Sequence, residues 1–458
     1  MHNSPPWAIG LAGLSGLLVV VAVTTDPRTP LPYLVAVGPL VVGLTWWRPV
    51  WGFAGLLGLV LISEQRPETL AAGVEPFLLQ GLPLFENIRD YTPLSFVYAN
   101  VVELWLVLVI VVWLLRGIQQ GDLRLRPVPC PMAYCLAAGT IALTFVLGVS
   151  HGGDLKTALW EVRTFGYLFG LSWLLSQIVT RRRDLRLILW VLIIGLGTKA
   201  LQGLYFYFIV LRMQLDLEAT FLAHEDPVMF IPLFFLLIGL LHHRTAPRLT
   251  RALAVATPIM LAGLVLTQRR VAYIVLPLSA VFFAILLAPA ARRTFARYAL
   301  PMVAVGAFYV FLYWGSASPL GMPIARALQL FDSDNTSNNY RVVELEDLRY
   351  TVRAHPWGLG FGQPFETPYS LPKVWVFWDT IPHNQIVWIW VKSGTPGFIL
   401  VMFYFARLVA ESTWAYRRLR EPLLRVVASV IGLVIIGQLV ASYYDVQLTF
   451  GRNMMYFG

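Results

Sequence analysis

The chain has 458 residues, of which 57% are apolar, 14% are aromatic and only 13% carry a charge. Soluble domains have a smaller apolar share and roughly twice this charged share, so the composition excludes a soluble globular enzyme and predicts a polytopic membrane protein. The net charge of +10 comes from Lys and Arg spread over many loops rather than gathered in one stripe, which argues against a nucleic acid as partner.

Apolar runs of roughly 15 to 24 residues, long enough to cross ~30 Å of hydrocarbon as helices, recur about thirteen times. They predict an all-α, polytopic transmembrane bundle of about 12–14 helices. The first run lacks the basic start and the small-residue cleavage site of a signal peptide, so we expect it to be retained. The runs centre on residues 7–24, 31–47, 50–63, 95–115, 131–149, 164–179, 187–210, 228–242, 252–267, 271–288, 299–315, 384–409 and 423–441.

Basic clusters fall on every second loop and predict the orientation. They lie at residues 116–126, 181–186, 242–251, 291–297 and 416–425. Because short cytoplasmic loops accumulate Lys and Arg, these loops and the N-terminus are expected on the cytoplasmic side, beside anionic membrane lipids. The loops at 64–94, 150–163, 211–227 and 316–383 are then expected outside or in the periplasm.

Four residues near the predicted spans carry reactive or ionisable groups. Cys130 and Cys135 are five residues apart, a spacing that fits neither a disulfide across one helical face nor a metal site, so we predict packing roles. Glu103 and Lys199 lie within apolar runs, where ionisable side chains are functional candidates by default, and Glu103 is a candidate partner for an arginine.

The long loop at 316–383 is the one sizeable insertion in a single membrane domain. Its stretch "YRVVELEDLRYTVRA" predicts a helix capped by Asn338 or Asn339 and ended at His355, because Pro356 disfavours α geometry in the residue before it. We expect this helix to lie on the membrane with its apolar side down. The apolar positions at helical spacing are Leu345, Leu348 and Val352.

Two further motifs are weak on their own. Gly358, Gly360 and Gly362 form a G-x-G-x-G run that follows no strand, so it predicts a tight backbone path near another surface or a phosphate rather than a nucleotide site. The "HEDP" at 224–227 has no second ligand cluster at metal spacing and favours a loop entry over a metal site.

Several cations are expected on the outer side at membrane depth. Arg269 and Arg270 stand out, because they occupy a short turn on the face where arginine is normally avoided. Snorkelling to lipid headgroups explains any one such residue, but several together favour a phosphate-bearing substrate, since guanidinium groups bind phosphate oxygens in pairs and stabilise charge on a departing diphosphate. The full set is Arg163, Arg212, Arg269, Arg270, Arg341 and Lys392.

His383 lies where the chain enters the next apolar run. A neutral imidazole there can take a proton from an attacking hydroxyl, although an interfacial histidine bonded to a loop carbonyl is the alternative. Gly394, Pro396 and Gly397 break the helix that follows, and irregular backbone at this depth is tolerated only inside protein or beside a cavity. We therefore expect His383 to mark the mouth of a hydrated site.

These residues resemble a known pattern. His383 and Asn384, then nine residues, Gly394, two residues and Gly397, match the H-[NSQ]-x9-G-x-x-[GTY] pattern of bacterial O-antigen ligases and the wider O-antigen ligase and polymerase superfamily. The arginines of "TQRR", the "YR" that opens the long loop and "HPWGLGFG" are similar too. The resemblance covers roughly residues 150–440 and separates ligase from polymerase poorly.

The resemblance implies a metal-independent, inverting membrane glycosyltransferase without a cofactor, at the periplasmic face of the bacterial inner membrane. Its donor would be an undecaprenyl-diphosphate-linked glycan, and its acceptor a hydroxyl of a glycan, lipid or protein. Arg270 would bind the diphosphate, Arg341 would close over it, and His383 would activate the acceptor. The family usually has a small residue where Arg269 stands, so the resemblance does not rank Arg269 against Arg270.

Other substrate contacts and one other function class stay open. Arg163, Arg212, Asn384 and Lys392 are candidate substrate-binding residues. Trp375 and Trp378 fit sugar stacking and an interfacial aromatic belt about equally well. A transporter or flippase of an anionic lipid or sugar is the alternative, but one broken helix and one large single-sided loop favour an enzyme.

Overall fold

The computed structural model describes residues 30–65, 77, 79–90, 98–212, 222–287, 289–316, 318, 321–329, 336–373 and 376–458. Regular structure in these ranges is helical, and an isolated bridge between Asn87 and Asn100 is the only strand-like pairing in them. This confirms the predicted all-α fold class. The predicted run at 7–24 lies outside the described residues, and each of the others falls on a helix.

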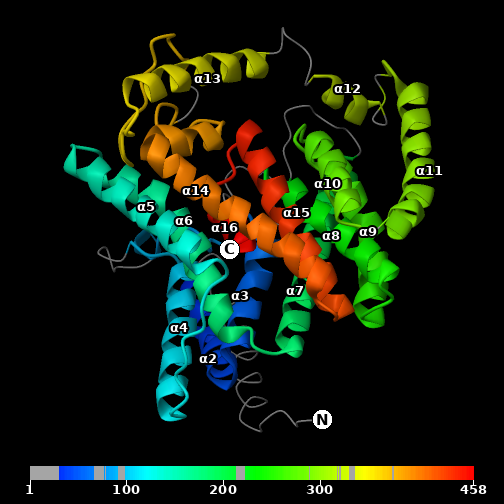
Figure 1. Cartoon of the computed structure of the whole chain (residues 1–458), viewed down its shortest axis with the longest axis horizontal. Helices are drawn as coiled ribbons and strands as arrows, with labels where there is room; N and C mark the ends of the chain where they lie inside the picture. Colours follow the sequence, from blue (N-terminus) through cyan, green and yellow to red (C-terminus); the bar gives the residue numbers. More distant parts are fainter. Residues whose placement is uncertain are drawn as a thin grey trace. The chain divides into compact units, whose positions relative to one another are not determined.

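The chain divides into two compact units, which we describe separately. The first unit comprises residues 1–127 and 172–199, and the second comprises 128–171 and 200–458. The helices α6 (Leu155–Ile178) and α7 (Arg182–Tyr205) each contribute to both units (Figure 1).

The first unit contains α2 (Pro30–Trp47), α3 (Pro49–Ile62), η2 (Ile88–Asp90) and α4 (Val101–Gln119). Its two notable ionisable residues are both accounted for. Lys199 forms a buried ion pair with Glu64. Glu103 forms a capping box with Asn100 at the start of α4.

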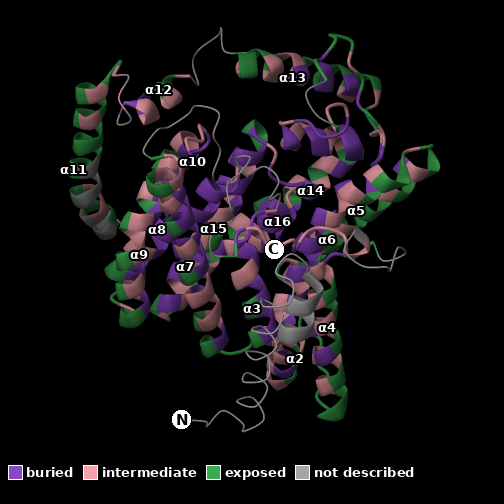
Figure 2. Cartoon of the chain, turned by 180° about the vertical axis from the view of Figure 1, so that it is seen from behind, coloured by how far each residue is buried: buried purple, intermediate pink, exposed green. Residues whose placement is uncertain are grey.

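The second unit is built around α14 (Gln385–Arg418), which packs against α5 (Pro131–Ser150) and α15 (Pro422–Tyr444). The helix α8 (Asp226–His242) packs on α15 and is buried along most of its length (Figure 2). The remaining elements are η3 (Phe206–Val210), α9 (Pro247–Leu266), α10 (Ala272–Leu286), α11 (Pro289–Tyr313), α12 (Met322–Leu328), α13 (Thr336–Ala354) and α16 (Gly451–Phe457).

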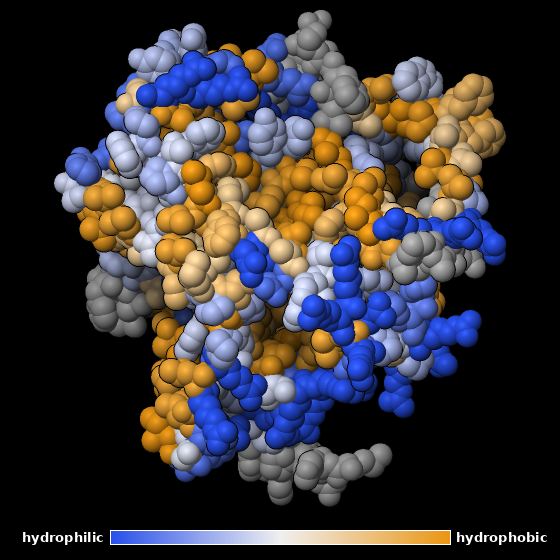
Figure 3. Space-filling view, viewed as in Figure 1, coloured by the Kyte–Doolittle hydropathy of each residue, from blue (hydrophilic) through white to orange (hydrophobic). Residues whose placement is uncertain are grey.

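Six described helices are long and apolar enough to cross a membrane. They are Val101–Gln119, Pro131–Ser150, Arg182–Val210, Pro247–Leu266, Gln385–Arg418 and Pro422–Tyr444. Figure 3 shows apolar side chains gathered over α10, α14 and α15, whereas side chains along α13 are hydrophilic. Exposed apolar residues such as Val281, Ile399 and Ile431 need a lipid environment, which fits a multi-pass membrane protein.

The helix α13 ends at Ala354, as the Pro356 rule predicts, but two expectations about it are wrong. It contains Asn338 and Asn339 rather than being capped by them, because the helix already includes Thr336. Its apolar side does not face lipid, since Leu348 is fully buried against Phe365 and Val391.

The glycine run at residues 358–362 forms backbone hydrogen bonds with the broken turn of α14. Gly394 adopts a non-helical conformation with φ 67°, and Pro396 has no N–H to bond the carbonyl of Lys392. Backbone groups of the glycine run replace the lost helix bonds: Leu359 N–H donates to Val391 O at 3.0 Å, and Gly360 N–H donates to Lys392 O at 2.9 Å.

The glycines of this run permit a backbone approach that a side chain would block. An added Cβ on Gly358 would lie 2.4 Å from Gly394 N, and one on Gly360 would lie 2.2 Å from Gly148 Cα in α5. The predicted tight path near another surface is thus present. The break itself lies inside protein, against the glycine run and close to α5, which is one of the two surroundings expected for irregular backbone at this depth.

The short C-terminal helix α16 is also buried (Figure 2). Its Arg452 is fully buried and pairs with Glu225 at 3.1 Å and Asp226 at 2.6 Å. The "HEDP" stretch is therefore more than a loop entry, since two of its carboxylates hold α16 in the second unit.

Candidate active site

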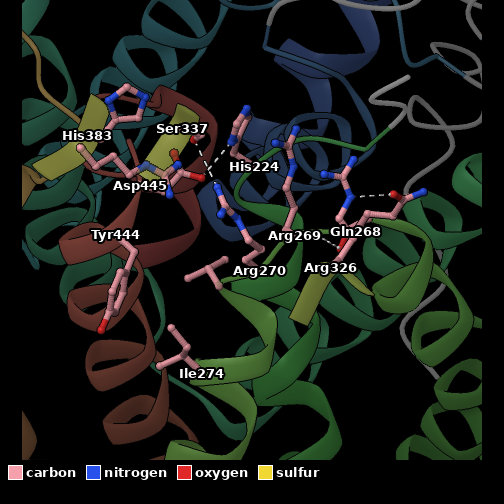
Figure 4. Close-up of a pocket in the computed structure, with 13 residues that line it drawn as sticks. His224, Gln268, Arg269, Arg270, Ile274, Arg326, Ser337, His383, Tyr444 and Asp445 are labelled. Atoms are coloured by element: carbon pink, nitrogen blue, oxygen red, sulfur yellow. Dashed lines mark hydrogen bonds and ion pairs between the residues drawn. The ribbon is translucent and has the colours of Figure 1, made fainter. Parts of the chain in front are cut away.

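The second unit contains a cavity of about 340 Å³ whose walls are mainly polar (Figure 4). We call it the cation cavity, because four arginines and two histidines line it and Asp445 is the carboxylate among its lining residues. A volume of this size fits a small polar group such as a diphosphate. The lining residues are His224, Thr267, Gln268, Arg269, Arg270, Val271, Ile274, Arg326, Ser337, Arg341, His383, Tyr444 and Asp445.

The turn between α9 and α10 supplies two of the arginines. Gln268 has φ 51°, a left-handed conformation that lets the chain reverse within a few residues. The carbonyls of Arg269 and Arg270 accept hydrogen bonds from Ala272 N–H and Tyr273 N–H at 3.1 Å each, so both arginines sit at the start of α10. The N-terminal end of a helix favours anions, which adds to the positive charge of the turn.

The structure separates the two neighbouring arginines. The guanidinium of Arg270 donates to Asn338 Oδ1 at 2.7 Å, to Ser337 Oγ at 3.2 Å and to Gln329 O at 3.3 Å, so it ties the turn to the start of α13. Arg269 is deeper, and its Nε is buried without a hydrogen-bond partner among the described residues. Burial lowers the pKa of Arg269 most, while Asp445, Glu225 and Asp226 oppose this effect.

Arg341 and Arg326 bring positive charge from the insertion. The Nε of Arg341, on α13, is buried and has no hydrogen-bond partner in the described part of the chain. Arg326, on α12, donates to Gln268 Oε1 at 3.3 Å and Gln329 Oε1 at 3.0 Å. Arg269 and Arg341 are thus the two arginines of the cavity whose Nε groups have no hydrogen-bond partner among the described residues.

His383 is oriented by a carboxylate that the sequence did not single out. Glu344 of α13 is buried, and it accepts the backbone N–H of His383 at 2.9 Å and lies 3.1 Å from its Nδ1. Because a carboxylate accepts rather than donates, Nδ1 carries a proton, and Nε2 is the ring nitrogen that has the lone pair in a neutral ring. The ring of Tyr340 packs edge-on at 5.5 Å, and burial raises the pKa of Tyr340 above its ordinary range, so the phenol stays neutral.

A second histidine and carboxylate pair lies at the same cavity. Nδ1 of His224 is 2.9 Å from Asp445 Oδ2, and Val446 N–H donates to Asp445 Oδ1 at 2.9 Å. Burial alone would raise the pKa of Asp445, but His224, Arg341 and Arg269 hold the pKa of this carboxyl well below its ordinary range. Asp445 is therefore ionised and partly balances the arginines.

Several predicted site residues lie elsewhere. Lys392 is buried and pairs with Glu161 at 2.8 Å beneath the glycine run, and it is not among the residues that line the cation cavity. Asn384 caps α14 by accepting Val387 N–H at 3.0 Å. Trp378 lies under Lys373, whose Nζ is 5.4 Å from the ring centroid. Trp375 lies outside the described residues.

Arg163 and Arg212 are also absent from the cavity walls. Arg163 lies on α6, and Arg212 lies exposed just after η3 with φ 46°. The structure therefore brings together four of the predicted residues, namely Arg269, Arg270, Arg341 and His383, and leaves the described others apart.

The sequence missed Glu344, His224 and Asp445. Glu344 follows Arg341 by three residues on the predicted helix, which is a signal for a shared face but not for contact with His383. Asp445 follows the last apolar run at its predicted outer end, on the same side as His383. A search for ionisable residues at the outer ends of spans would have found it.

An apolar groove of about 470 Å³ adjoins the cation cavity, and the two share Ile274 and Tyr444. Its lining comes from α10, α14 and α15: Ile274, Leu278, Ile386, Met402, Leu439, Val440, Tyr443 and Tyr444. A charged cavity next to an apolar groove suits an amphiphile with an anionic head.

The comparison with protein families bears on this arrangement. Residues 255–402 match the family model described as O-antigen ligase. This segment is similar to the O-antigen ligase family. It contains Arg269, Arg270, Arg341, Glu344 and His383, and the match confirms the resemblance to the O-antigen ligase and polymerase superfamily.

The domain match and the apolar helices together support a multi-pass membrane protein with a glycosyltransferase-type, O-antigen ligase-like function. His224 and Asp445 lie outside the matched segment, so they enter the cavity from the rest of the chain. No curated protein matches the chain.

Proposed function

We propose that this protein transfers or polymerises a glycan from an undecaprenyl-diphosphate-linked donor onto an acceptor hydroxyl. The reaction takes place at the periplasmic face of the bacterial inner membrane and inverts the anomeric carbon. The acceptor hydroxyl belongs to a glycan, a lipid or a protein. Guanidinium groups neutralise the diphosphate in this proposal, in place of a metal ion.

The observation that carries the proposal is the pairing of two open arginines with one oriented histidine. Arg269 and Arg341 present buried Nε groups without described partners at the cavity that His383 also lines. Leaving buried donors unpaired costs about 1–3 kcal/mol each, a cost that an arriving phosphate offsets. A purely structural cluster would give these groups carboxylate partners instead.

The apolar groove supports a lipid-linked donor rather than a free sugar phosphate. With the diphosphate in the cation cavity, the isoprenoid chain enters the groove through the shared residues Ile274 and Tyr444. Because lipid tails are as apolar as the groove, this contact aligns the donor rather than supplying hydrophobic free energy.

The chemical step follows from the two sets of groups. Nε2 of His383 takes the proton of the acceptor hydroxyl, and the hydroxyl oxygen forms a bond to the anomeric carbon on the face opposite the diphosphate. The bond from the anomeric carbon to the phosphate oxygen breaks, and its electron pair stays on the diphosphate. Arg269 and Arg341 stabilise the charge that develops there.

In this proposal Arg270 and Arg326 position the helices that carry the site residues. Arg270 donates to Asn338 Oδ1 and Gln329 O, and Arg326 donates to Gln268 of the turn, so these bonds hold α12 and α13 over the α9–α10 turn. Since α13 carries both Arg341 and Glu344, these contacts keep the diphosphate-binding and acceptor-activating groups in register.

The test is a transfer assay with a short-chain polyprenyl-diphosphate oligosaccharide in liposomes, comparing wild type with His383→Ala and Arg341→Ala. We expect wild type to release polyprenyl diphosphate, and His383→Ala to bind donor but turn over about 10²–10⁴-fold more slowly. The acceptor end of the product distinguishes polymerase from ligase. Movement of labelled donor across the bilayer without transfer would instead identify a transporter.

A further inference from the structure

His224 is the cavity residue with the least obvious task. It lies outside the segment that matches the O-antigen ligase family, and the predicted reaction already has a base in His383. Its ring is held on two sides, by Asp445 at 2.9 Å and by the ring of Phe450, which is stacked at 6.4 Å with an interplanar angle of 12°. A side chain fixed in this way at a cavity wall is oriented to contact a ligand in the cavity.

The hydrogen bond to Asp445 fixes the tautomer of His224. Asp445 is ionised and can only accept, so Nδ1 of His224 carries a proton. A neutral ring then has a lone pair at Nε2, which repels phosphate oxygens, whereas a protonated ring donates from Nε2. Only the protonated form can bind a phosphate.

The charges around His224 change when an anion enters the cavity. The arginines of the cavity oppose a further positive charge while the cavity holds no anion, and an arriving diphosphate reverses that balance. The charged groups of the surrounding elements are Arg269, Arg270, Arg326, Arg341 and Asp445, together with Glu225 and Asp226, which pair with Arg452.

We propose that His224, held by Asp445, is a second anion-binding residue of this site and takes up a proton as the donor's diphosphate binds. This rests on the proposed function, because it assumes that a diphosphate enters the cation cavity. In the transfer step His383 accepts the proton of the acceptor hydroxyl, while protonated His224 hydrogen-bonds the diphosphate oxygen that receives the electron pair. The two histidines thus act on opposite sides of the anomeric carbon.

The test measures binding and proton uptake rather than turnover. Farnesyl diphosphate is titrated into the full-length protein in detergent at pH 7, in two buffers whose ionisation enthalpies differ, so that calorimetry reports the protons taken up. We expect wild type to take up as much as about one proton per diphosphate bound. His224→Gln should lose that uptake and bind about tenfold to a hundredfold more weakly.

A matched control is available in the same unit. His355 forms a similar pair with Glu366, with Nε2 and Oε1 2.7 Å apart, but it is on the surface and does not line the cavity. His355→Gln should bind like wild type. If His224→Gln lowers the melting temperature, His224→Phe keeps a ring against Phe450 and replaces it in the titration.

Three outcomes would overturn the inference. Unchanged affinity and proton uptake in His224→Gln would remove His224 from the site and leave the proposed function intact. Uptake that is lost in His383→Ala and kept in His224→Gln would assign the proton to the other histidine. Failure of wild type to bind farnesyl diphosphate would overturn both this inference and the proposed function.

Discussion

The Lys392–Glu161 pair and the cation cavity both place charges inside the second unit, but they balance those charges differently. Lys392 and Glu161 are fully buried and 2.8 Å apart, and Glu161 also accepts the N–H of Gly362. In the cavity, four arginines line one space together with the single carboxylate of Asp445. The first arrangement is closed and structural, whereas the second leaves positive charge for a ligand.

This contrast shows why the type of residue alone does not identify a site. Lys392, Arg269 and Arg341 share one prediction from the sequence, a cation on the outer side at membrane depth. Only the location of carboxylates in space separates them, because a buried cation with a close carboxylate has little attraction left for a substrate.

The largest effect is expected from breaking the closed pair. Lys392→Met leaves Glu161 buried and uncompensated, which should lower the free energy of unfolding by about 3–5 kcal/mol. Adding Glu161→Leu should restore most of the lost free energy of unfolding. Unfolding in detergent measures this quantity for the single and the double variant.

The control for this pair lies on the same helix. Arg407 and Glu411 form an exposed pair at 2.9 Å, and Arg407→Met should cost about 0.5 kcal/mol or less. Equal stability of the Lys392→Met and Arg407→Met variants would contradict a structural role for the Lys392–Glu161 pair.

The open cavity should respond in binding rather than in stability. Arg269→Gln removes a cation whose Nε has no hydrogen-bond partner among the described residues, and it should weaken binding of an isoprenoid diphosphate about tenfold to a hundredfold, with a smaller effect on the free energy of unfolding. Arg270→Gln should instead speed amide exchange at the start of α13, because it removes the bonds to Ser337 and Asn338.

Binding and amide exchange on the two variants decide the ranking of these neighbours. If Arg270→Gln lost binding while α13 exchanged normally, the assignment of the deep phosphate contact to Arg269 would be wrong. Arg269→Lys should not restore full affinity, since an ammonium cannot hold two phosphate oxygens in the planar geometry of a guanidinium.

A smaller effect tests the glycine run that covers the closed pair. Gly360 has φ 85° and would place a Cβ 2.2 Å from Gly148 Cα, whereas Gly152 has φ 89° and no atom within 4 Å of such a Cβ. Gly152→Ala should cost about 1–2 kcal/mol from backbone strain alone. Gly360→Ala should cost a further ~1–3 kcal/mol from the collision, and equal melting temperatures would refute the packing account.

The smallest effect concerns a buried carboxylate that belongs neither to the Lys392–Glu161 pair nor to the cation cavity. Asp347 on α13 is fully buried, and its Oδ2 has no hydrogen-bond partner among the described residues. Burial, the largest cause, raises the pKa of Asp347. The pKa of Asp347 is therefore higher in the folded than in the unfolded chain. As the pH rises through the range in which the unfolded carboxyl ionises, the folded state loses stability, and this loss is complete at neutral pH.

Asp347→Asn should therefore raise the free energy of unfolding at pH 7 by about 1 kcal/mol or less. The gain should shrink as the pH falls toward about 4, where the carboxyl in the unfolded chain is itself half protonated. Exposed Asp122 provides a control, and a gain of the same size in Asp122→Asn would mean that net charge, not burial, is responsible.

Much of the fold and part of the site could be predicted from the sequence. Apolar runs predict the helices, since a span through hydrocarbon must satisfy its own backbone groups. Pro356 predicts the end of α13, and the residues Gly394 and Pro396 predict the break in α14. Arg269, Arg270, Arg341 and His383 follow from charge at the outer ends of spans and from the resemblance in motif.

Other assignments depended on contacts between distant parts of the chain. Glu344 reaches His383 across 39 positions, and His224 reaches Asp445 across 221. No local pattern reports such distances, because helices of a bundle place together residues that are far apart in sequence. For the same reason no local pattern around Lys392 indicates its buried partner, Glu161 of α6.

The sequence by itself determined that this is an all-helical membrane protein with an O-antigen ligase-like motif and excess positive charge on one set of loops. These features depend only on residues that are close together in the sequence. Only the tertiary structure decided which cations are neutralised and which remain open. That distinction depends on where each carboxylate lies, since the energy of a buried charge is set by the groups within a few ångströms of it.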